Sequence, residues 1–218
     1  RALDTEQQAV REAFARSIAA CPPGATAIFS AEALCNFSAD DLARLRDYLG
    51  AHARQLRAVG YVRAPVSCME SVFQQRVKSG AGALELARNY PRYRERLRKF
   101  ERVLGPQQVA YWPFAPQRFP AGCVVQDFCA RTGIAFRGES PPRANESLSL
   151  PALRLLFAYR RFGPGFGSGP DALRENGELR QCLKTLPGPR LRFHASLVAP
   201  LLEAERADIA WMEERLGC

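Results

Sequence analysis

Lysine is almost absent from this sequence: only three of its 31 basic residues, Lys78, Lys99 and Lys184, are lysines, and the rest are arginines. The arginines are scattered along the chain, whereas nucleic-acid-binding proteins usually concentrate basic residues on one face or in one tail. The net charge of +9 therefore argues less for a nucleic-acid partner than for an anionic small ligand or an acidic glycan. Such ligands are steered toward a basic protein by long-range attraction.

Cysteine is present, but without the spacings that metal sites and disulfide frameworks need. The seven cysteines are odd in number and form no Cys-x-x-Cys or paired Cys/His motif, which argues against zinc and against a secreted, disulfide-stapled protein. The sequence contains no run of about 18 apolar residues, which is the length needed to cross a bilayer. The chain opens with neither a signal peptide nor an initiator methionine. We therefore expect a cytoplasmic protein without a membrane span, and a sequence that begins inside a longer chain.

The sequence also lacks a phosphate-binding loop of the kind in which glycines precede a Lys and a Ser or Thr. The glycine-rich run of residues 163–169 has no such ending and follows a predicted helix, so it is interpreted as a flexible linker. With 218 residues, of which 47% are hydrophobic, the chain can form one sizeable core. We expect residues 1–162 to form an α/β core and residues 163–218 a helical extension packed on the same domain.

Residues 59–80, VGYVRAPVSCMESVFQQRVKSG, are predicted to form a strand, a turn and a helix. Val59 and Tyr61 are β-favouring residues at a period of two. Pro65 forces the residue before it out of helical geometry and suits the first turn of a helix. Arg63 would then lie at the carboxyl end of the strand, beside a helix N-terminus whose N–H groups favour anions. Because ligands of open α/β sheets bind at this edge, the segment predicts a phosphate site.

Two further residues extend this predicted phosphate site. Ser71 lies eight positions after Arg63, on the second turn of the predicted helix, and Lys78-x-Gly80 closes the segment with a cation and a helix stop. An arginine can hold a phosphate through two parallel N–H bonds, and a serine hydroxyl adds one directional donor. A structural interpretation stays open, in which Arg63 pairs with a carboxylate and Ser71 is only a solvated helix residue.

An earlier apolar run, residues 26–30, is predicted to be a short buried strand that ends at the polar tip Ser30-Ala31-Glu32. Ser38 is predicted to cap a helix over residues 39–52, which would connect this strand to the next one in a parallel βαβ unit. Glu32 would then lie at the same sheet edge as Arg63, where its carboxylate could deprotonate an acceptor hydroxyl. Alternatively, Glu32 is a first-turn helix residue and Ser30 is its cap.

The remainder of the chain is predicted to be mostly helical. Pro91 should kink or break the helix predicted over residues 81–105, and Ser149 should be the N-cap of the helix predicted over residues 151–162. His194 is interpreted as a packing or capping residue. Apolar residues at helical spacing predict helices over residues 2–21, 81–105, 121–132, 151–162, 171–183 and 199–216, and a short apolar run predicts a strand over residues 109–114.

Arg63-x-Pro65, Ser71, Lys78-x-Gly80 and, more weakly, Ser30-x-Glu32 resemble the motifs of bacterial sulfotransferase-like proteins, and the resemblance covers most of residues 26–162. It implies a three-layer α/β/α fold with a mostly parallel sheet, of the P-loop NTPase type. It also implies transfer of a sulfuryl group from 3′-phosphoadenosine 5′-phosphosulfate (PAPS) to a hydroxyl or amine of a carbohydrate or small-molecule acceptor, leaving 3′,5′-adenosine diphosphate (PAP). In that family pattern Arg63, Ser71, Lys78 and Asn145 would bind the nucleotide and Glu32 would be the catalytic base, without a metal.

One departure from the family pattern bears on activity. The glycine-rich loop that cradles the 5′-phosphosulfate in that family is missing from residues 1–218. We therefore expect the complete protein to be a PAPS-dependent sulfotransferase and the 218-residue chain alone to be inactive. The alternative is a catalytically incomplete nucleotide-binding or protein-interaction domain of the same fold, in which Arg63 and Ser71 are structural. Asn145 is equally explained by capping of the helix that follows it.

Overall fold

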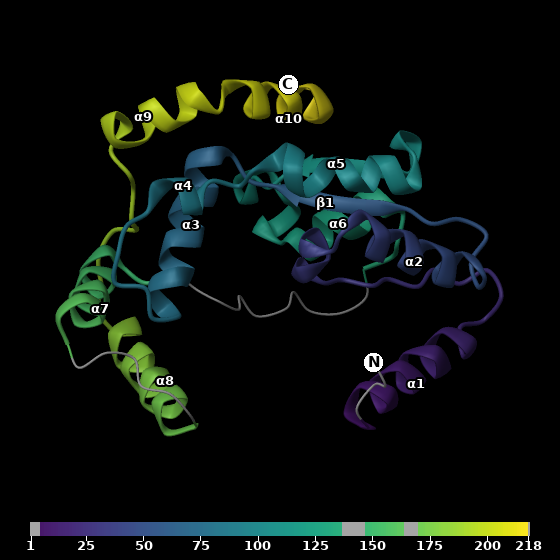
Figure 1. Ribbon diagram of the computed structural model, residues 1–218, viewed down its shortest axis with the longest axis horizontal. Helices are drawn as coiled ribbons and strands as arrows, with labels where there is room; N and C mark the ends of the chain where they lie inside the picture. Colours follow the sequence, from purple (N-terminus) through teal and green to yellow (C-terminus); the bar gives the residue numbers. More distant parts are fainter. Residues whose placement is uncertain (1–4, 137–146, 164–169, 218) are drawn as a thin grey trace. The chain divides into compact units, whose positions relative to one another are not determined.

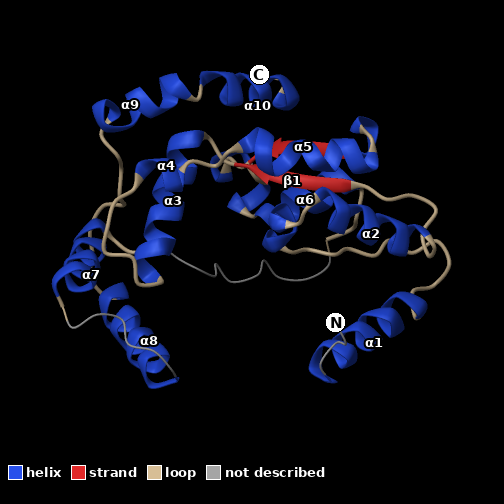
Figure 2. Ribbon diagram, in the orientation of Figure 1, coloured by secondary structure: helices blue, strands red, loops and turns tan. Residues whose placement is uncertain are grey.

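The computed structural model describes residues 5–136, 147–163 and 170–217, and no side chain is described for residues 170–173 or for Gln7. It is an α/β structure that is mostly helical, with β1 and β2 paired in a small parallel sheet (Figures 1 and 2). The helices, 3-10 helices (η) and strands follow one another as α1 (Thr5–Ala19), η1 (Glu32–Asn36), α2 (Ala39–Gly50), β1 (Ala58–Val62), α3 (Pro65–Lys78), α4 (Leu86–Asn89), α5 (Tyr93–Leu104), η2 (Pro106–Gln108), β2 (Val109–Pro113), η3 (Pro116–Arg118), η4 (Pro120–Gly122), α6 (Val124–Thr132), α7 (Leu150–Phe162), α8 (Pro170–Lys184), α9 (Ala195–Ala204) and α10 (Arg206–Leu216).

The chain divides into two compact units. The first comprises Arg1–Val59 and Arg94–Ala110, and the second comprises Gly60–Tyr93 and Tyr111–Cys218. Both units are therefore assembled from separate stretches of sequence. The boundary at residue 163, expected from the sequence, stays a prediction.

Within the first unit, α2 begins as the sequence predicts. The Ser38 hydroxyl accepts a hydrogen bond from the Asp41 backbone N–H at 3.0 Å, and the Asp41 carboxylate accepts one from the Ser38 N–H in return. This reciprocal capping box satisfies two N–H groups that would otherwise lack partners at the helix end. Leu42, one residue further on, is the buried residue of α2. The predicted cap and helix are confirmed.

The predicted strand over residues 26–30 is wrong. This segment has no regular secondary structure and is exposed, and Glu32 instead begins η1, whose N-cap residue is Ala31 rather than Ser30. The Phe29 ring packs against the Phe14 ring of α1, with 4.9 Å between their centroids, while Ile28 is left 54% exposed. An apolar run of this length becomes a strand only when a neighbouring strand pairs with its backbone.

Within the second unit, β1 leads directly into α3, and both elements have the predicted positions. Pro65 is the first residue of α3 and Ala64 is its N-cap, in an extended conformation (φ −55°, ψ 146°). Helix α7 lies beside the lower part of α3, with α8 next to it (Figure 1). The hydrophobic core is formed where these three helices meet, by Phe73, Val77, Leu148, Ala152, Leu153, Leu156 and Leu183.

A second hydrophobic cluster joins α3 to α9 through Met69, Tyr90 and Val198. The buried carboxylate of Glu70 reinforces this side of α3 by accepting hydrogen bonds from the Arg192 guanidinium at 2.8 Å and from the Phe193 N–H at 2.9 Å. These contacts fix the extended segment between α8 and α9 on α3. A buried carboxylate is tolerated because both donors compensate for its lost hydration.

Several helix ends match the predictions, but some helices differ. The helix predicted from residue 81 begins only at Leu86, as α4, and the one predicted from residue 121 begins at Val124, as α6. The break at Pro91 separates α4 from α5, Ser149 caps α7 through the Ala152 N–H, and His194 caps α9 through the Ser196 N–H. Helix α6 ends at a left-handed Gly133, as the sequence predicts for residues 121–132. The single helix predicted for residues 199–216 is instead two helices, α9 and α10, which are separated at Glu205.

Candidate functional site

The junction between β1 and α3 forms the candidate site. Strand β1 ends at Val62, Arg63 follows, and α3 begins at Pro65. Among the described residues no side chain caps the N-terminus of α3, and the first hydrogen bond of this helix runs from the Cys68 N–H to the Ala64 carbonyl at 2.9 Å. The N–H groups of the first turn therefore have no partner within the helix, and the positive end of the helix dipole is not neutralised by a capping carboxylate.

The guanidinium of Arg63 is stacked rather than ion-paired. It lies 4.2 Å from the centroid of the Phe114 ring, in a cation–π contact, and the residue as a whole is exposed. Within the described part of the chain, no carboxylate pairs with it. Stacking restrains the plane of the guanidinium, while its N–H groups can still donate hydrogen bonds to an anion. A donor that is already restrained loses less entropy on binding.

The backbone on either side of Arg63 is anchored by hydrogen bonds. The Arg63 carbonyl accepts a bond from the Tyr93 hydroxyl at 2.5 Å, and the Val62 carbonyl accepts one from the Phe114 N–H at 2.7 Å. Tyr93 is held in turn through its own N–H, which donates to the Asp208 carboxylate of α10 at 2.9 Å. Burial, and then the electrostatic effect of Cys68 and of Asp208, raises the pKa of Tyr93 well above its ordinary range. Its hydroxyl therefore stays a donor at neutral pH.

An aromatic cluster packs around Tyr61, the strand residue two positions before Arg63. The Tyr61 ring contacts the rings of Trp112, Phe114 and Phe119, with centroids 5.4, 6.3 and 5.6 Å away. Its hydroxyl donates to the Asp127 carboxylate of α6 at 2.6 Å. Burial, then this hydrogen bond, raises the pKa of Tyr61 far above its ordinary range, so it does not ionise at neutral pH. Tyr61 therefore acts here as a packing and hydrogen-bonding group.

Asp127 is a buried carboxylate with two donors. Arg131, one turn further along α6, donates to the same oxygen as Tyr61, at 2.7 Å. Burial acts to raise the pKa of Asp127, but the hydrogen bonds from Tyr61 and Arg131 outweigh it and the pKa is lowered. Asp127 is therefore charged at neutral pH and holds two donors on one oxygen, which makes it a structural group rather than a base.

Of the other residues predicted to bind the nucleotide, Ser71 and Lys78 lie on α3 and Asn145 lies outside the described residues. With a rise of about 1.5 Å per residue, Ser71 is about 10 Å and Lys78 about 20 Å along the helix from its N-cap. Lys78 is buried at the far end of α3, where burial and then Arg180 and Lys184 lower its pKa. The structure thus places Ser71 in the N-terminal half of α3, the half nearer Arg63, and Lys78 at the opposite end.

The predicted catalytic base, Glu32, is an exposed residue at the start of η1 in the first unit. Because residues 26–30 are not a strand, Glu32 is not at the end of one, and the argument that placed it at the sheet edge no longer applies. Its alternative interpretation as a first-turn helix residue agrees with η1, although Ser30 is not the cap. A catalytic role for Glu32 stays a prediction.

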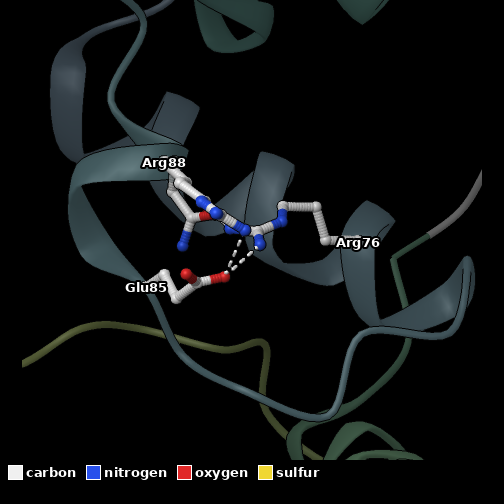
Figure 3. Close-up of polar contacts among 4 residues, drawn as sticks. Arg76, Glu85 and Arg88 are labelled. Carbon is white, nitrogen blue, oxygen red and sulfur yellow. Dashed lines mark hydrogen bonds and ion pairs between the residues drawn. The ribbon is translucent and has the colours of Figure 1, made fainter.

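The loop between α3 and α4 is held by an ionic network. Figure 3 shows Glu85 between two arginines: its carboxylate accepts hydrogen bonds from Arg76 at 2.7 Å and from Arg88 at 3.1 Å. The hydrogen bond from Arg76 is the main reason why the pKa of Glu85 is lowered. Arg76 also donates to the buried side chain of Asn89 at 2.9 Å. These arginines are consumed by structural contacts, which distinguishes them from Arg63.

Two residues of the site were missed by the sequence analysis. Phe114 is the stacking platform of Arg63, and Tyr93 anchors its carbonyl. The aromatic-Pro-Phe ending of the predicted strand over residues 109–114 was a signal for Phe114, because parallel neighbours end at the same edge of a sheet. Tyr93 gave no comparable signal, since it meets Arg63 only through the tertiary fold.

Searches against family models, curated proteins and solved structures found no match for this chain. Among the residues that the structure describes, no group of three or more His, Cys, Asp or Glu side chains could hold a metal ion.

Proposed function

We propose that Arg63 and the first turn of α3 bind the 3′-phosphate of PAPS, and that the complete protein transfers the sulfuryl group to a hydroxyl or amine of a carbohydrate or small molecule. The observation that carries this proposal is the exposed Arg63 guanidinium, stacked on Phe114 at the end of a parallel strand and beside an uncapped helix N-terminus. A guanidinium and free N–H groups together form a binding site for a dianion.

The chain's own groups would act by position and charge. Arg63 would grip the phosphate through two N–H bonds, and Ser71 would add a hydroxyl donor from further along α3. Lys78 does not hold the same phosphate in this proposal, because it is buried at the other end of the helix. The donor would supply the activated sulfuryl group. That Glu32 takes the proton of the acceptor stays a separate prediction, because Glu32 belongs to the first compact unit and Arg63 to the second.

The proposal also includes the architecture. The strand pair β1–β2 would belong to a larger, mostly parallel sheet with helices on both faces, as in the P-loop NTPase type of fold. A parallel sheet of that kind places its ligands at the carboxyl ends of its strands, which is where Arg63 lies.

Isothermal titration calorimetry with 3′,5′-adenosine diphosphate tests the proposal, with the wild-type chain compared with Arg63→Ala. A hydrogen bond to a charged group contributes about 1.5–3 kcal/mol, which is about 10- to 150-fold in affinity, so losing both bonds of Arg63 should weaken binding by at least that factor. Arg174→Ala is the matched control, because it removes one positive charge from an exposed position on α8. Its affinity should stay within about twofold of wild type.

Two outcomes would contradict the proposal. If folded wild-type protein does not bind the nucleotide, the proposed donor site does not exist. Binding that Arg63→Ala and Arg174→Ala weaken equally would show that only the net charge of the protein matters. If Arg63→Ala alone loses binding, an acceptor screen with Glu32→Gln as its control follows.

A second function is favoured by the missing glycine-rich loop. A domain that keeps Arg63 but has no loop for the 5′-phosphosulfate would bind an adenine nucleotide without transferring a group. Titration of the complete protein with adenosine 5′-phosphosulfate, which lacks the 3′-phosphate, separates the two functions. Transfer chemistry requires contacts to the phosphosulfate end, whereas a binding domain of this kind would recognise 3′,5′-adenosine diphosphate and ignore the other nucleotide.

A further inference from the structure

The outward side of α7 carries three large apolar side chains that the fold leaves in solvent. Leu155 is 57% exposed, Tyr159 41% and Phe162 79%. Spacings of four and three residues place them along one side of the helix. The adjoining side of α7 is already explained, because Ala152, Leu153 and Leu156 are buried in the core. The exposed side chains, which we call the α7 ridge, have no role in that core.

Two arginines accompany the α7 ridge. Arg154 and Arg161 are both exposed and are seven residues apart, so they lie two turns apart on the same outward half of α7. The Arg161 guanidinium lies over the Phe162 ring, 5.4 Å from its centroid. Throughout the described ranges, no carboxylate forms an ion pair with either arginine. The outward half of α7 therefore combines apolar and aromatic side chains with unneutralised positive charge.

The size and charge of this surface indicate what it contacts. A stable protein interface uses about 20–30 residues on each side, far more than the five side chains of this helix face. A second copy of the chain would bring the same arginines and a net charge of +9, and would be repelled. A lipid surface needs no matching shape: aromatic and leucine side chains enter the headgroup region, and anionic lipids attract arginines.

We propose that α7 docks on an anionic membrane surface. Leu155, Tyr159 and Phe162 enter the interface, while Arg154 and Arg161 contact lipid phosphates. The tyrosine suits this level of a membrane because its ring is apolar and its hydroxyl stays hydrated. No helix in the described part of the chain is long and apolar enough to cross a membrane, so the contact is peripheral. The net charge of +9 adds a long-range attraction that brings the protein to such a surface.

Co-sedimentation of the 218-residue chain with lipid vesicles tests this proposal. Vesicles of phosphatidylcholine with about one third phosphatidylserine should bind the protein at low salt, and pure phosphatidylcholine should bind it much less. Phe162→Asp should lower the partition coefficient at least about tenfold, because it removes an inserted ring and adds a repelled charge. Arg161→Gln should lower it about fivefold at low salt, and less as salt is raised.

Leu197→Asp is the matched control, since Leu197 is an apolar residue of α9 that is 43% exposed and lies outside the α7 ridge. It should bind vesicles like wild type. Leu155→Asp provides a second ridge variant, and circular dichroism establishes that each variant is folded. The proposal fails if wild type stays in the supernatant with anionic vesicles, or if both ridge variants bind as well as Leu197→Asp. It also fails if the ridge binds an acidic peptide while ignoring vesicles, because the surface would then be a protein-docking site.

Discussion

Tyr61→Phe is the substitution that best isolates one interaction beneath the candidate site. It removes the hydroxyl that donates to Asp127 at 2.6 Å and keeps the ring that contacts Trp112, Phe114 and Phe119. The buried Asp127 carboxylate would then depend on Arg131 alone. A hydrogen bond to a charged group contributes about 1.5–3 kcal/mol, so we expect the free energy of unfolding to fall by about that amount.

The assay is equilibrium unfolding in guanidinium chloride, followed by circular dichroism, with Tyr159→Phe as control. Tyr159 is 41% exposed and its hydroxyl has no hydrogen bond within the described residues, so its removal should change the free energy of unfolding by less than about 0.5 kcal/mol. The reasoning is refuted if Tyr61→Phe is no less stable than Tyr159→Phe.

The same pair of residues gives a pH dependence whose sign is fixed. The pKa of Asp127 in the folded protein is below its ordinary value of 3.8, so the charged carboxylate stabilises the fold above that pH. This stabilisation is lost as pH falls through the folded-state pKa. The difference between wild type and Tyr61→Phe should therefore be largest near neutrality. It should shrink in acid toward the contribution of a hydrogen bond between neutral groups, about 0.5–1.5 kcal/mol.

Two further predictions concern backbone positions. Ser38→Ala should lower the free energy of unfolding of the first unit by about 1 kcal/mol because it removes the cap of α2, and denaturant titration measures this; an unchanged midpoint would contradict the assignment of the capping box. Gly82→Ala should destabilise the protein, because its new methyl group would lie 2.8 Å from the Arg160 carbonyl oxygen. Gly177→Ala should instead raise the stability by about 0.4–1 kcal/mol, because this position is in the middle of α8 and a methyl group there would meet no atom within 4 Å. Thermal unfolding of both glycine variants should show shifts of opposite sign, and shifts of the same sign would refute the packing argument.

Local signals in the sequence were enough to predict the segment that carries the candidate site. These signals depend only on residues close by in the sequence: Pro65 at the start of a helix, the β-favouring residues before Arg63, and the capping serines at 38 and 149. The structure agrees with each of them. The three-layer fold expected from the resemblance stays a prediction, because only β1 and β2 form a sheet in the residues that the structure describes.

The errors and omissions arise where distant residues decide the outcome. Residues 26–30 have the composition of a strand, but Phe29 packs on Phe14 instead of pairing with a strand. Lys78 has the right residue type for an anion site, yet helix geometry carries it about 20 Å from the N-cap of α3. The stacking of Arg63 on Phe114 is likewise a tertiary contact between residues 51 positions apart. The end of the predicted strand indicates that Phe114 lies at the same sheet edge, but only the fold brings the two side chains together.

The hydrogen bonds around Tyr93 make the C-terminal helix part of the candidate site. Asp208 of α10 accepts bonds from the Tyr93 N–H and from the Tyr90 hydroxyl, and the Tyr93 hydroxyl in turn binds the Arg63 carbonyl. The conformation of residue 63 is thus set in part by a residue 145 positions away along the chain. A chain cut before α10 loses this anchor and would present Arg63 on a loose strand end. Shortened versions of the protein should therefore retain α10.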